Sequence, residues 1–131
     1  MAGYVIRPLP SATATAVADG GAVETAVLTL SGVSVPGPGA DVHLMGHVNV
    51  TAGTGATAIV VTVRRGTGTA GAIVGVAETD TLAAGNKESI PFDVVDAPGD
   101  VAGESYTVTT TETGATADGT VNYVTMGGYV D

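Results

Sequence analysis

The sequence predicts an all-β protein, and three observations carry that prediction. Short runs rich in Val and Thr recur along the chain, and turns rich in Gly, Ala and Asp separate them. Val and Thr are β-branched and favour strands, whereas Gly and Asp tolerate turn conformations. Turn signals recur about every 8–12 residues, with no convincing helical period between them. We therefore expect a jelly-roll-like β-sandwich of about eight to ten antiparallel strands with an extended N-terminal arm.

The first part of the chain differs from the rest and predicts the arm, residues 1–22. A short strand-like tetrad is followed by Pro8 and Pro10, and the segment ends at a Gly pair. The simpler interpretations are a frayed terminus or a first edge strand. The sharper hypothesis is an arm that adds a strand to a neighbouring molecule. The tetrad that would make this contact is Tyr4, Val5, Ile6 and Arg7.

Residues 23–131 are expected to form the β-sandwich domain. The clearest alternation runs from 41 to 51, with Val42, Leu44, Gly46, Val48 and Val50 on one face and His43, Met45, His47 and Asn49 on the other. Pro91 places its strand at an edge or a bulge, and 81–87 has room for one helical turn. The other expected strands cover 23–35, 57–65, 72–77, 89–95, 105–113 and 120–126.

Composition excludes several classes of function. The 131 residues suit one domain, and the net charge of −9 with only four basic residues disfavours nucleic acid and anionic membranes as partners. The chain has no Cys, which excludes disulfides and thiolate sites. Neither a signal peptide nor a membrane span is expected, so we expect synthesis in the cytoplasm. Aromatic residues are only 4%, and the resulting thin core makes oligomerisation a natural source of further burial.

The candidate catalytic and ligand motifs favour structural interpretations. Residues 66–71 match G-x-G-x-x-G, but a strand rather than a helix is expected to follow, so the match indicates a strand connection. His43 and His47 share a strand face about 13 Å apart, too far for one metal ion, and only a symmetry axis would bring copies together. No nucleophile elbow is present, so we expect no enzyme, and neither a cofactor nor a metal.

The charged clusters also favour structural roles. An acidic loop with Asp93, Asp96 and Asp100, followed by Glu104, lacks the EF-hand pattern and is expected to be solvated rather than to bind calcium. Arg64 and Arg65 are expected to neutralise nearby carboxylates, or to meet an acidic face of another copy.

The chain as a whole resembles capsid decoration (cement) or head-surface proteins of tailed bacteriophages, which form TNF-like trimeric jelly rolls. The resemblance rests on Asn49–Thr57 leading into Ile59–Gly66, and on Ser105–Thr109 with Gly119–Val124. The resemblance covers about residues 23–126 in the general pattern of Val/Thr runs and Gly-rich turns, and it matches no defined sequence signature. It implies a homotrimer on the capsid surface of the virion, with the major capsid protein as partner and residues 4–7 as the lattice contact.

We therefore expect a virion structural protein that binds the exterior of a phage capsid as a trimer and stabilises the shell. The alternative is a carbohydrate-binding or adhesin-like β module of a phage fibre or cell surface, with Tyr106, Tyr123 and Tyr129 as its only plausible sugar platforms. A third hypothesis, an enzyme such as a cupin, requires several His and carboxylates converging inside a barrel.

Overall fold

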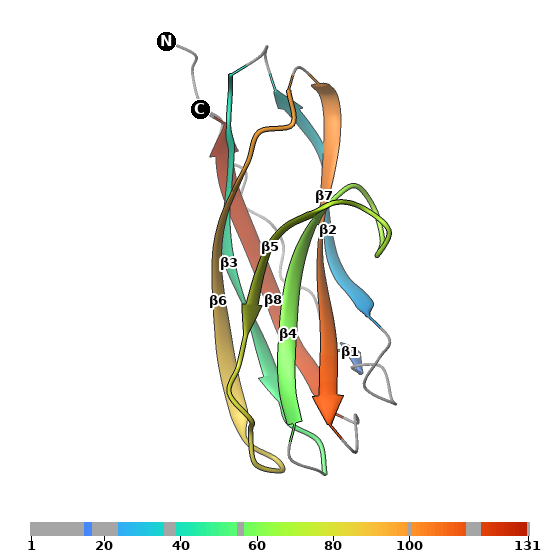
Figure 1. Cartoon of the computed structure of the whole chain (residues 1–131), viewed down its shortest axis with the longest axis vertical. Helices are drawn as coiled ribbons and strands as arrows, with labels where there is room; N and C mark the ends of the chain where they lie inside the picture. Colours follow the sequence, from blue (N-terminus) through green and yellow to red (C-terminus); the bar gives the residue numbers. More distant parts are fainter. Residues whose placement is uncertain are drawn as a thin grey trace.

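The computed structural model describes residues 15–16, 24–35, 39–54, 57–99, 101–114 and 119–130. These residues form two four-stranded antiparallel sheets packed face to face (Figure 1). The first sheet has the order β1-β8-β3-β6 and the second the order β2-β7-β4-β5. The strands are β1 (Thr15–Ala16), β2 (Thr25–Val35), β3 (Val42–Thr51), β4 (Thr57–Arg65), β5 (Ile73–Glu78), β6 (Lys87–Asp96), β7 (Val101–Gly114) and β8 (Thr120–Val130).

This strand order is that of an eight-stranded jelly roll, in which consecutive strands lie in different sheets except for β4 and β5, which pair as neighbours. The prediction of an all-β jelly-roll-like sandwich is confirmed, and the number of strands falls in the expected range. Every strand pair is antiparallel. The described ranges hold no helix long and apolar enough to cross a membrane.

Strand β3 lies at the centre of its sheet and carries the alternation that the sequence predicts. It pairs with β6 on one side and with β8 on the other, over its full length. Val42, Leu44, Val48 and Val50 are buried, and the side chains between them point to the outer face of the sheet. At Gly46 an added Cβ would lie 1.9 Å from a backbone carbonyl oxygen of β8, so only Gly fits there.

The core fills the space between the two sheets within one chain. It is built mainly from Val, with Phe92 and Tyr106 as its aromatic members. Residues Tyr106 to Thr110 are buried on both faces of β7, and on the outer face Thr107 donates to the Gly66 carbonyl and Thr109 to Glu24. The buried hydrophobic cluster comprises Leu30, Val33, Val35, Ala40, Val42, Leu44, Val48, Val50, Ile59, Val61, Val63, Ile90, Phe92, Tyr106, Val108, Val121, Val124, Met126 and Val130.

Local predictions mostly agree with the structure, with one exception. Pro91 lies in β6, which is an edge strand as predicted. The helical turn expected at 81–87 is wrong, because Asn86 N–H donates to the Ala83 carbonyl in a tight turn and Gly85 N–H donates to the β3–β4 connection. The 66–71 segment joins β4 to β5, with Gly66 and Gly68 at positive φ, so the strand-connection prediction is confirmed.

Part of the predicted arm belongs to the sandwich. Thr15–Ala16 pairs with Val121 and Thr120 of β8 and forms an edge strand of the first sheet, which is the edge-strand alternative. The remainder of residues 1–22 lies outside the described residues, so the division at residue 22 stays a prediction.

Candidate interaction surface

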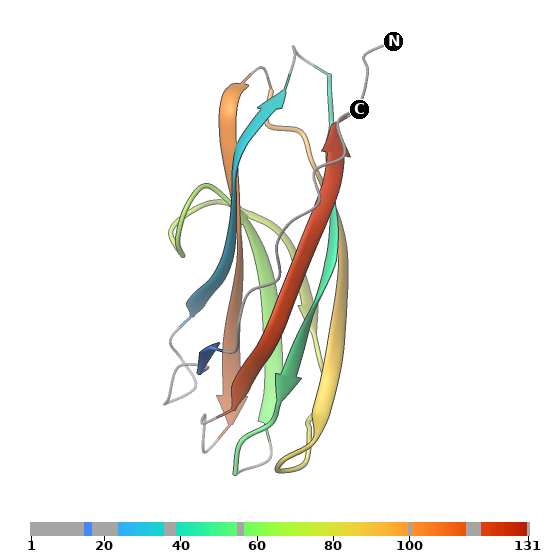
Figure 2. The ribbon, with the colours of Figure 1, turned by 180° about the vertical axis from the view of Figure 1, so that it is seen from behind.

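The outer face of the β8-β3-β6 sheet carries two pairs of aromatic side chains; in Figure 2 this sheet lies toward the viewer. The rings of His43 and Tyr129, which are opposite each other in the β3–β8 register, stack with centroids 4.4 Å apart. The ring of His47 meets Tyr123 edge to face at 5.3 Å. His47 Nδ1 also lies 3.2 Å from the Thr125 hydroxyl. These contacts fix the orientation of the rings on the surface.

A β-bulge next to these rings turns two consecutive side chains outward. In the β3–β8 register Asn49 is opposite Tyr123 and Val50 is opposite Val121, so Asn122 is the extra residue. Val121 and Val124 are buried, whereas Asn122 is half-buried and Tyr123 is 39% exposed. Ordinary alternation would have turned either Asn122 or Tyr123 into the core.

A ladder of polar side chains crosses the three strands at this bulge. Asn122 Nδ2 donates to Asn49 Oδ1 at 2.9 Å and to Thr51 Oγ1 at 2.8 Å. Asn49 Nδ2 in turn donates to Ser89 Oγ at 2.9 Å. Each amide is therefore held in one orientation by its neighbour.

A polar network around the buried Asp96 side chain ties the two sheets together. Asp96 of β6 accepts hydrogen bonds from Arg65 of β4, at 2.8 and 2.5 Å, and from the Tyr106 hydroxyl of β7 at 2.7 Å. Burial by itself would raise the pKa of Asp96, but the bonds from Arg65 and Tyr106 outweigh it and hold that pKa below its ordinary value. Burial and the bond to Asp96 raise the pKa of Tyr106, so the phenol remains a donor.

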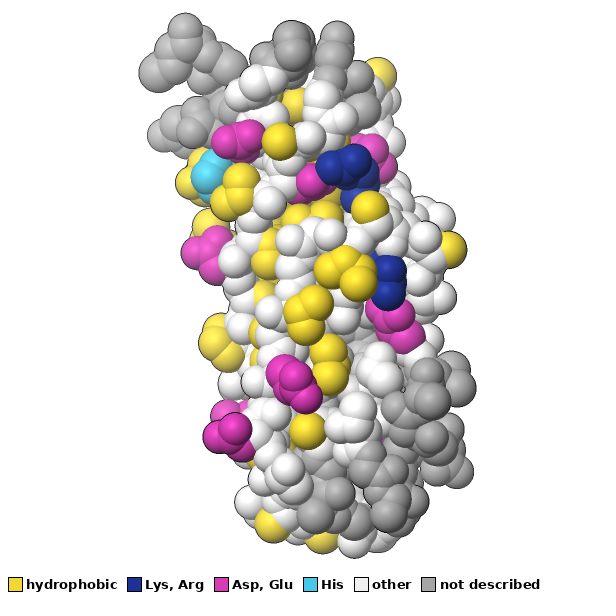
Figure 3. Space-filling view, viewed as in Figure 1, with side chains coloured by type: hydrophobic (Ala, Val, Ile, Leu, Met, Phe, Trp, Pro, Cys, Tyr) yellow, Lys and Arg dark blue, Asp and Glu magenta, His cyan; other side chains and the backbone are white. Residues whose placement is uncertain are grey.

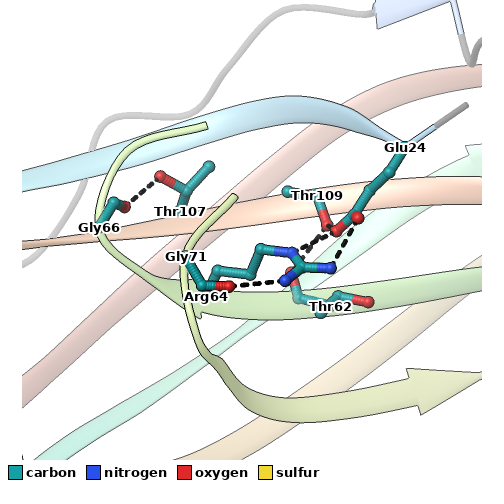
Figure 4. A network of polar contacts seen from close by, with 7 residues as sticks. All are labelled: Glu24, Thr62, Arg64, Gly66, Gly71, Thr107 and Thr109. Atoms are coloured by element: carbon teal, nitrogen blue, oxygen red, sulfur yellow. Dashed lines mark hydrogen bonds and ion pairs between the residues drawn. The ribbon is translucent and has the colours of Figure 1, made fainter. Parts of the chain in front are cut away.

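A second network covers the outer face of the other sheet (Figure 4). Arg64 Nε and a terminal nitrogen donate to the two Glu24 carboxylate oxygens at 2.7 and 2.8 Å, and Arg64 also donates to the Gly71 carbonyl. Glu24 accepts a further bond from Thr109, and the Arg64 bond is the main reason that its pKa lies below its ordinary value. The prediction that the Arg pair neutralises carboxylates is confirmed for both arginines.

The structure sorts the predicted site residues into three groups. The tetrad Tyr4, Val5, Ile6 and Arg7 lies outside the described residues. Tyr106 is fully buried and cannot serve as a sugar platform, which corrects its place among the candidates. Tyr123 and Tyr129 lie on the outer face of β8, as a platform requires.

The acidic residues do not assemble into a metal site in the part of the chain that the structure describes, where no group of three His, Asp or Glu side chains is placed to hold an ion. Asp96 is buried rather than solvated, because alternation places it on the inward face of β6 with Ile90 and Phe92, where its carboxylate accepts from Arg65 and Tyr106. Asp100 lies outside the described residues. His43 and His47 point to the same outer face, as predicted, but each contacts a different tyrosine.

The edge strand β5 carries the most exposed large hydrophobic side chains among those described. Ile73 is 58% and Val76 is 57% exposed. Figure 3 shows hydrophobic side chains gathered on the side of the molecule that carries β4 to β6, with basic side chains beside acidic ones. Strand β5 itself holds one charged residue, Glu78 at its end. Strand β5 has no Pro or Lys to block pairing of this sheet edge with another chain, and neither has β2 at the other edge of the sheet.

Comparison with known proteins gives a likeness of fold. No protein family model and no curated protein matches the sequence. The structure is similar to the infectious bursal disease virus VP2 subviral particle, with a TM-score of 0.56 at 14% identity over 97% of this chain and 32% of that one. It is also similar to infectious bursal disease virus Gx strain, with a TM-score of 0.54 at 13% identity over 98% of this chain and 38% of that one. The chain thus spans about a third of the length of these viral proteins.

Proposed function

We propose that this chain is a virion structural protein without enzymatic activity: a capsid decoration protein that binds the exterior of a phage capsid as a trimer and stabilises the shell. The observation that carries this proposal is the jelly-roll strand order, together with a fold likeness to virus particle structures over 97–98% of the chain. The strongly negative charge suits a soluble protein that coats a surface at high local concentration.

The described surfaces support contacts between copies. The core closes within one chain, so a trimer would gain its burial from outer residues such as Ile73 and Val76 rather than from the interior. Strand β5 has neither Pro nor Lys, the residues that commonly block edge pairing. Beside it on the same side of the sandwich, the edge strand β6 of the other sheet carries Pro91 in mid-strand and charges at several positions.

In this mechanism the segment Tyr4–Arg7 makes the contact with the capsid lattice. Three arms on one trimer would bind together, and the effective concentration of the second and third arm raises avidity. Because the trimer binds across junctions present only in the assembled shell, it shifts the equilibrium toward the assembled state.

Co-sedimentation with capsids tests the proposal. The full chain is mixed with mature capsids of the phage that encodes it and, separately, with unassembled capsid subunits, and its solution mass is measured by light scattering. We expect a trimer that pellets with capsids and does not bind free subunits, and a chain lacking residues 1–10 that keeps its β-sheet circular dichroism but binds far more weakly. Equal binding to both forms, or assembly of the chain alone into particles, would contradict a decoration role.

A further inference from the structure

We propose that the outer face of β3, β6 and β8 around the Asn122 bulge binds an uncharged saccharide. The amide–hydroxyl ladder of Ser89, Asn49 and Asn122 lies on one side of this site, and the exposed ring of Tyr123 lies on the other. This inference goes beyond the decoration role and does not depend on it.

The ladder leaves polar atoms free in fixed positions. Among the described residues, the hydrogen-bond partners of Asn122 and Asn49 are those already given, so Asn122 Oδ1 and one hydrogen of Asn49 Nδ2 have no partner. The Ser89 hydroxyl accepts one bond and keeps its hydrogen to donate. The row therefore offers donors at Ser89 and Asn49 and an acceptor at Asn122, on neighbouring strands that lie about 4.8 Å apart. Adjacent hydroxyls of a sugar ring both donate and accept, so they suit such a row.

The Tyr123 ring supplies the apolar part of the site. It is opposite Asn49 in the β3–β8 register, and its edge-to-face contact with His47 holds it in place. An aromatic ring held in this way packs against the C–H face of a sugar at a small entropic cost. The bulge is what places the ring and the Asn122 amide side by side on the outer face.

Charge selects a neutral ligand over an acidic one. The outward positions of β3, β6 and β8 from Pro91, His47 and Thr125 to Ser89, Asn49 and Tyr123 hold no Asp, Glu, Lys or Arg. The chain as a whole has a net charge of −9, which repels sialylated and sulfated glycans. An uncharged oligosaccharide meets no such repulsion.

A glycan array probed with the full chain tests the proposal, using neutral hexose and N-acetylhexosamine oligosaccharides beside sialylated and sulfated ones. The best neutral oligosaccharide is then titrated into ¹⁵N-labelled protein and followed by NMR. We expect shifts confined to amides of β3, β6 and β8, and affinity about tenfold or more weaker in Tyr123→Ser and Asn122→Ala.

The control is Thr69→Ala, which changes an exposed residue of the β4–β5 connection and is expected to bind as the unmodified chain does. Circular dichroism checks that each variant is folded, and Tyr123→Phe, which keeps the ring, serves if the Ser variant unfolds, with binding expected to be retained. The proposal is overturned by any of three results: no neutral oligosaccharide bound at millimolar concentration, binding of acidic glycans alone, or binding unchanged in both Tyr123→Ser and Asn122→Ala. If the chain failed to bind capsids, the expected saccharide binding would be unchanged, because the saccharide site does not depend on the decoration role.

Discussion

Replacing Tyr106 by Phe tests whether the buried polar network stabilises the fold. The substitution keeps the ring in the core, where Tyr106 is fully buried, and removes the hydroxyl that donates to Asp96 at 2.7 Å. A hydrogen bond to a charged group contributes about 1.5–3 kcal/mol. Because the same Asp96 oxygen still accepts from Arg65 at 2.8 Å, we expect a loss at the lower end, about 1.5–2 kcal/mol. For a chain of this length that lowers Tm by about 5–8 °C.

The pH dependence of this loss identifies its cause. The pKa of Asp96 is lowered in the folded protein, so its contribution is present above its unfolded pKa of about 3.9 and is lost as the pH falls through the folded pKa. The deficit of Tyr106→Phe is therefore expected to be full at pH 7 and to shrink as Asp96 becomes protonated. Urea unfolding followed by circular dichroism at pH 7, 5 and about 2 measures it.

Tyr123→Phe is the matched control, because it removes the same hydroxyl group from an exposed tyrosine, and its effect is expected to stay within about 0.5 kcal/mol. Two results would refute the reasoning. One is a Tyr106→Phe midpoint equal to that of the unmodified chain at pH 7. The other is a deficit of the same size at every pH.

Three further predictions follow from other contacts. Gly46→Ala places a Cβ 1.9 Å from a β8 carbonyl oxygen and should lower the free energy of unfolding by about 3 kcal/mol or more, seen as a sharply lower Tm or as insoluble protein. Stability close to that of the unmodified chain would mean that β3 and β8 can move apart. Arg64→Met removes the partner that lowers the pKa of Glu24, so the urea midpoint of this variant should lie below that of the unmodified chain at pH 7. The difference between the two midpoints should disappear as the pH falls below about 4, whereas a difference that stays constant with pH would assign the effect to packing. Val76→Asp is expected to convert the proposed trimer to monomers, measured as solution mass by light scattering, whereas the control Ala83→Asp, in an exposed turn, should leave the mass unchanged. A Val76→Asp chain with the same mass as the unmodified chain would place the interface elsewhere.

Much of the strand pattern could be predicted from local sequence, because it depends on neighbours along the chain. Alternation with a period of two predicts which side of β3 is buried, and the buried Val42, Leu44, Val48 and Val50 follow it. Pro91 excludes a central position for β6, since it cannot donate to a second neighbour.

The sequence predicts that Arg64 and Arg65 neutralise carboxylates, but their partners in the polar networks could not be predicted, because these lie far apart in the sequence. Asp96 reads as one more acid in an exposed loop, yet the sandwich brings it to Arg65, 31 residues away, and to Tyr106. Glu112 is also expected at the surface because its side chain is charged, but it is fully buried and accepts a hydrogen bond from the Gly119 N–H at 2.9 Å. Only the pairing of distant strands decides such contacts.

The proposed saccharide site shows the same division. Tyr123 was a candidate from composition, because tyrosines are few in this chain. Its companion Asn122 was not, since alternation alone would have turned one of the two residues inward. The extra residue at the bulge depends on the register between β3 and β8, which no local pattern encodes.

By itself, the sequence determined that this chain folds as β-strands and which strand faces are apolar, because propensity and alternation act locally along the chain. The expectation that nucleic acid and acidic membranes are poor partners rests on the net charge and stays a prediction. The tertiary structure alone decided the jelly-roll order, the burial of Tyr106 and Glu112, and the exposure of Tyr123 and Val76. Those outcomes depend on which distant strands become neighbours, and that choice is made by the packing of two whole sheets.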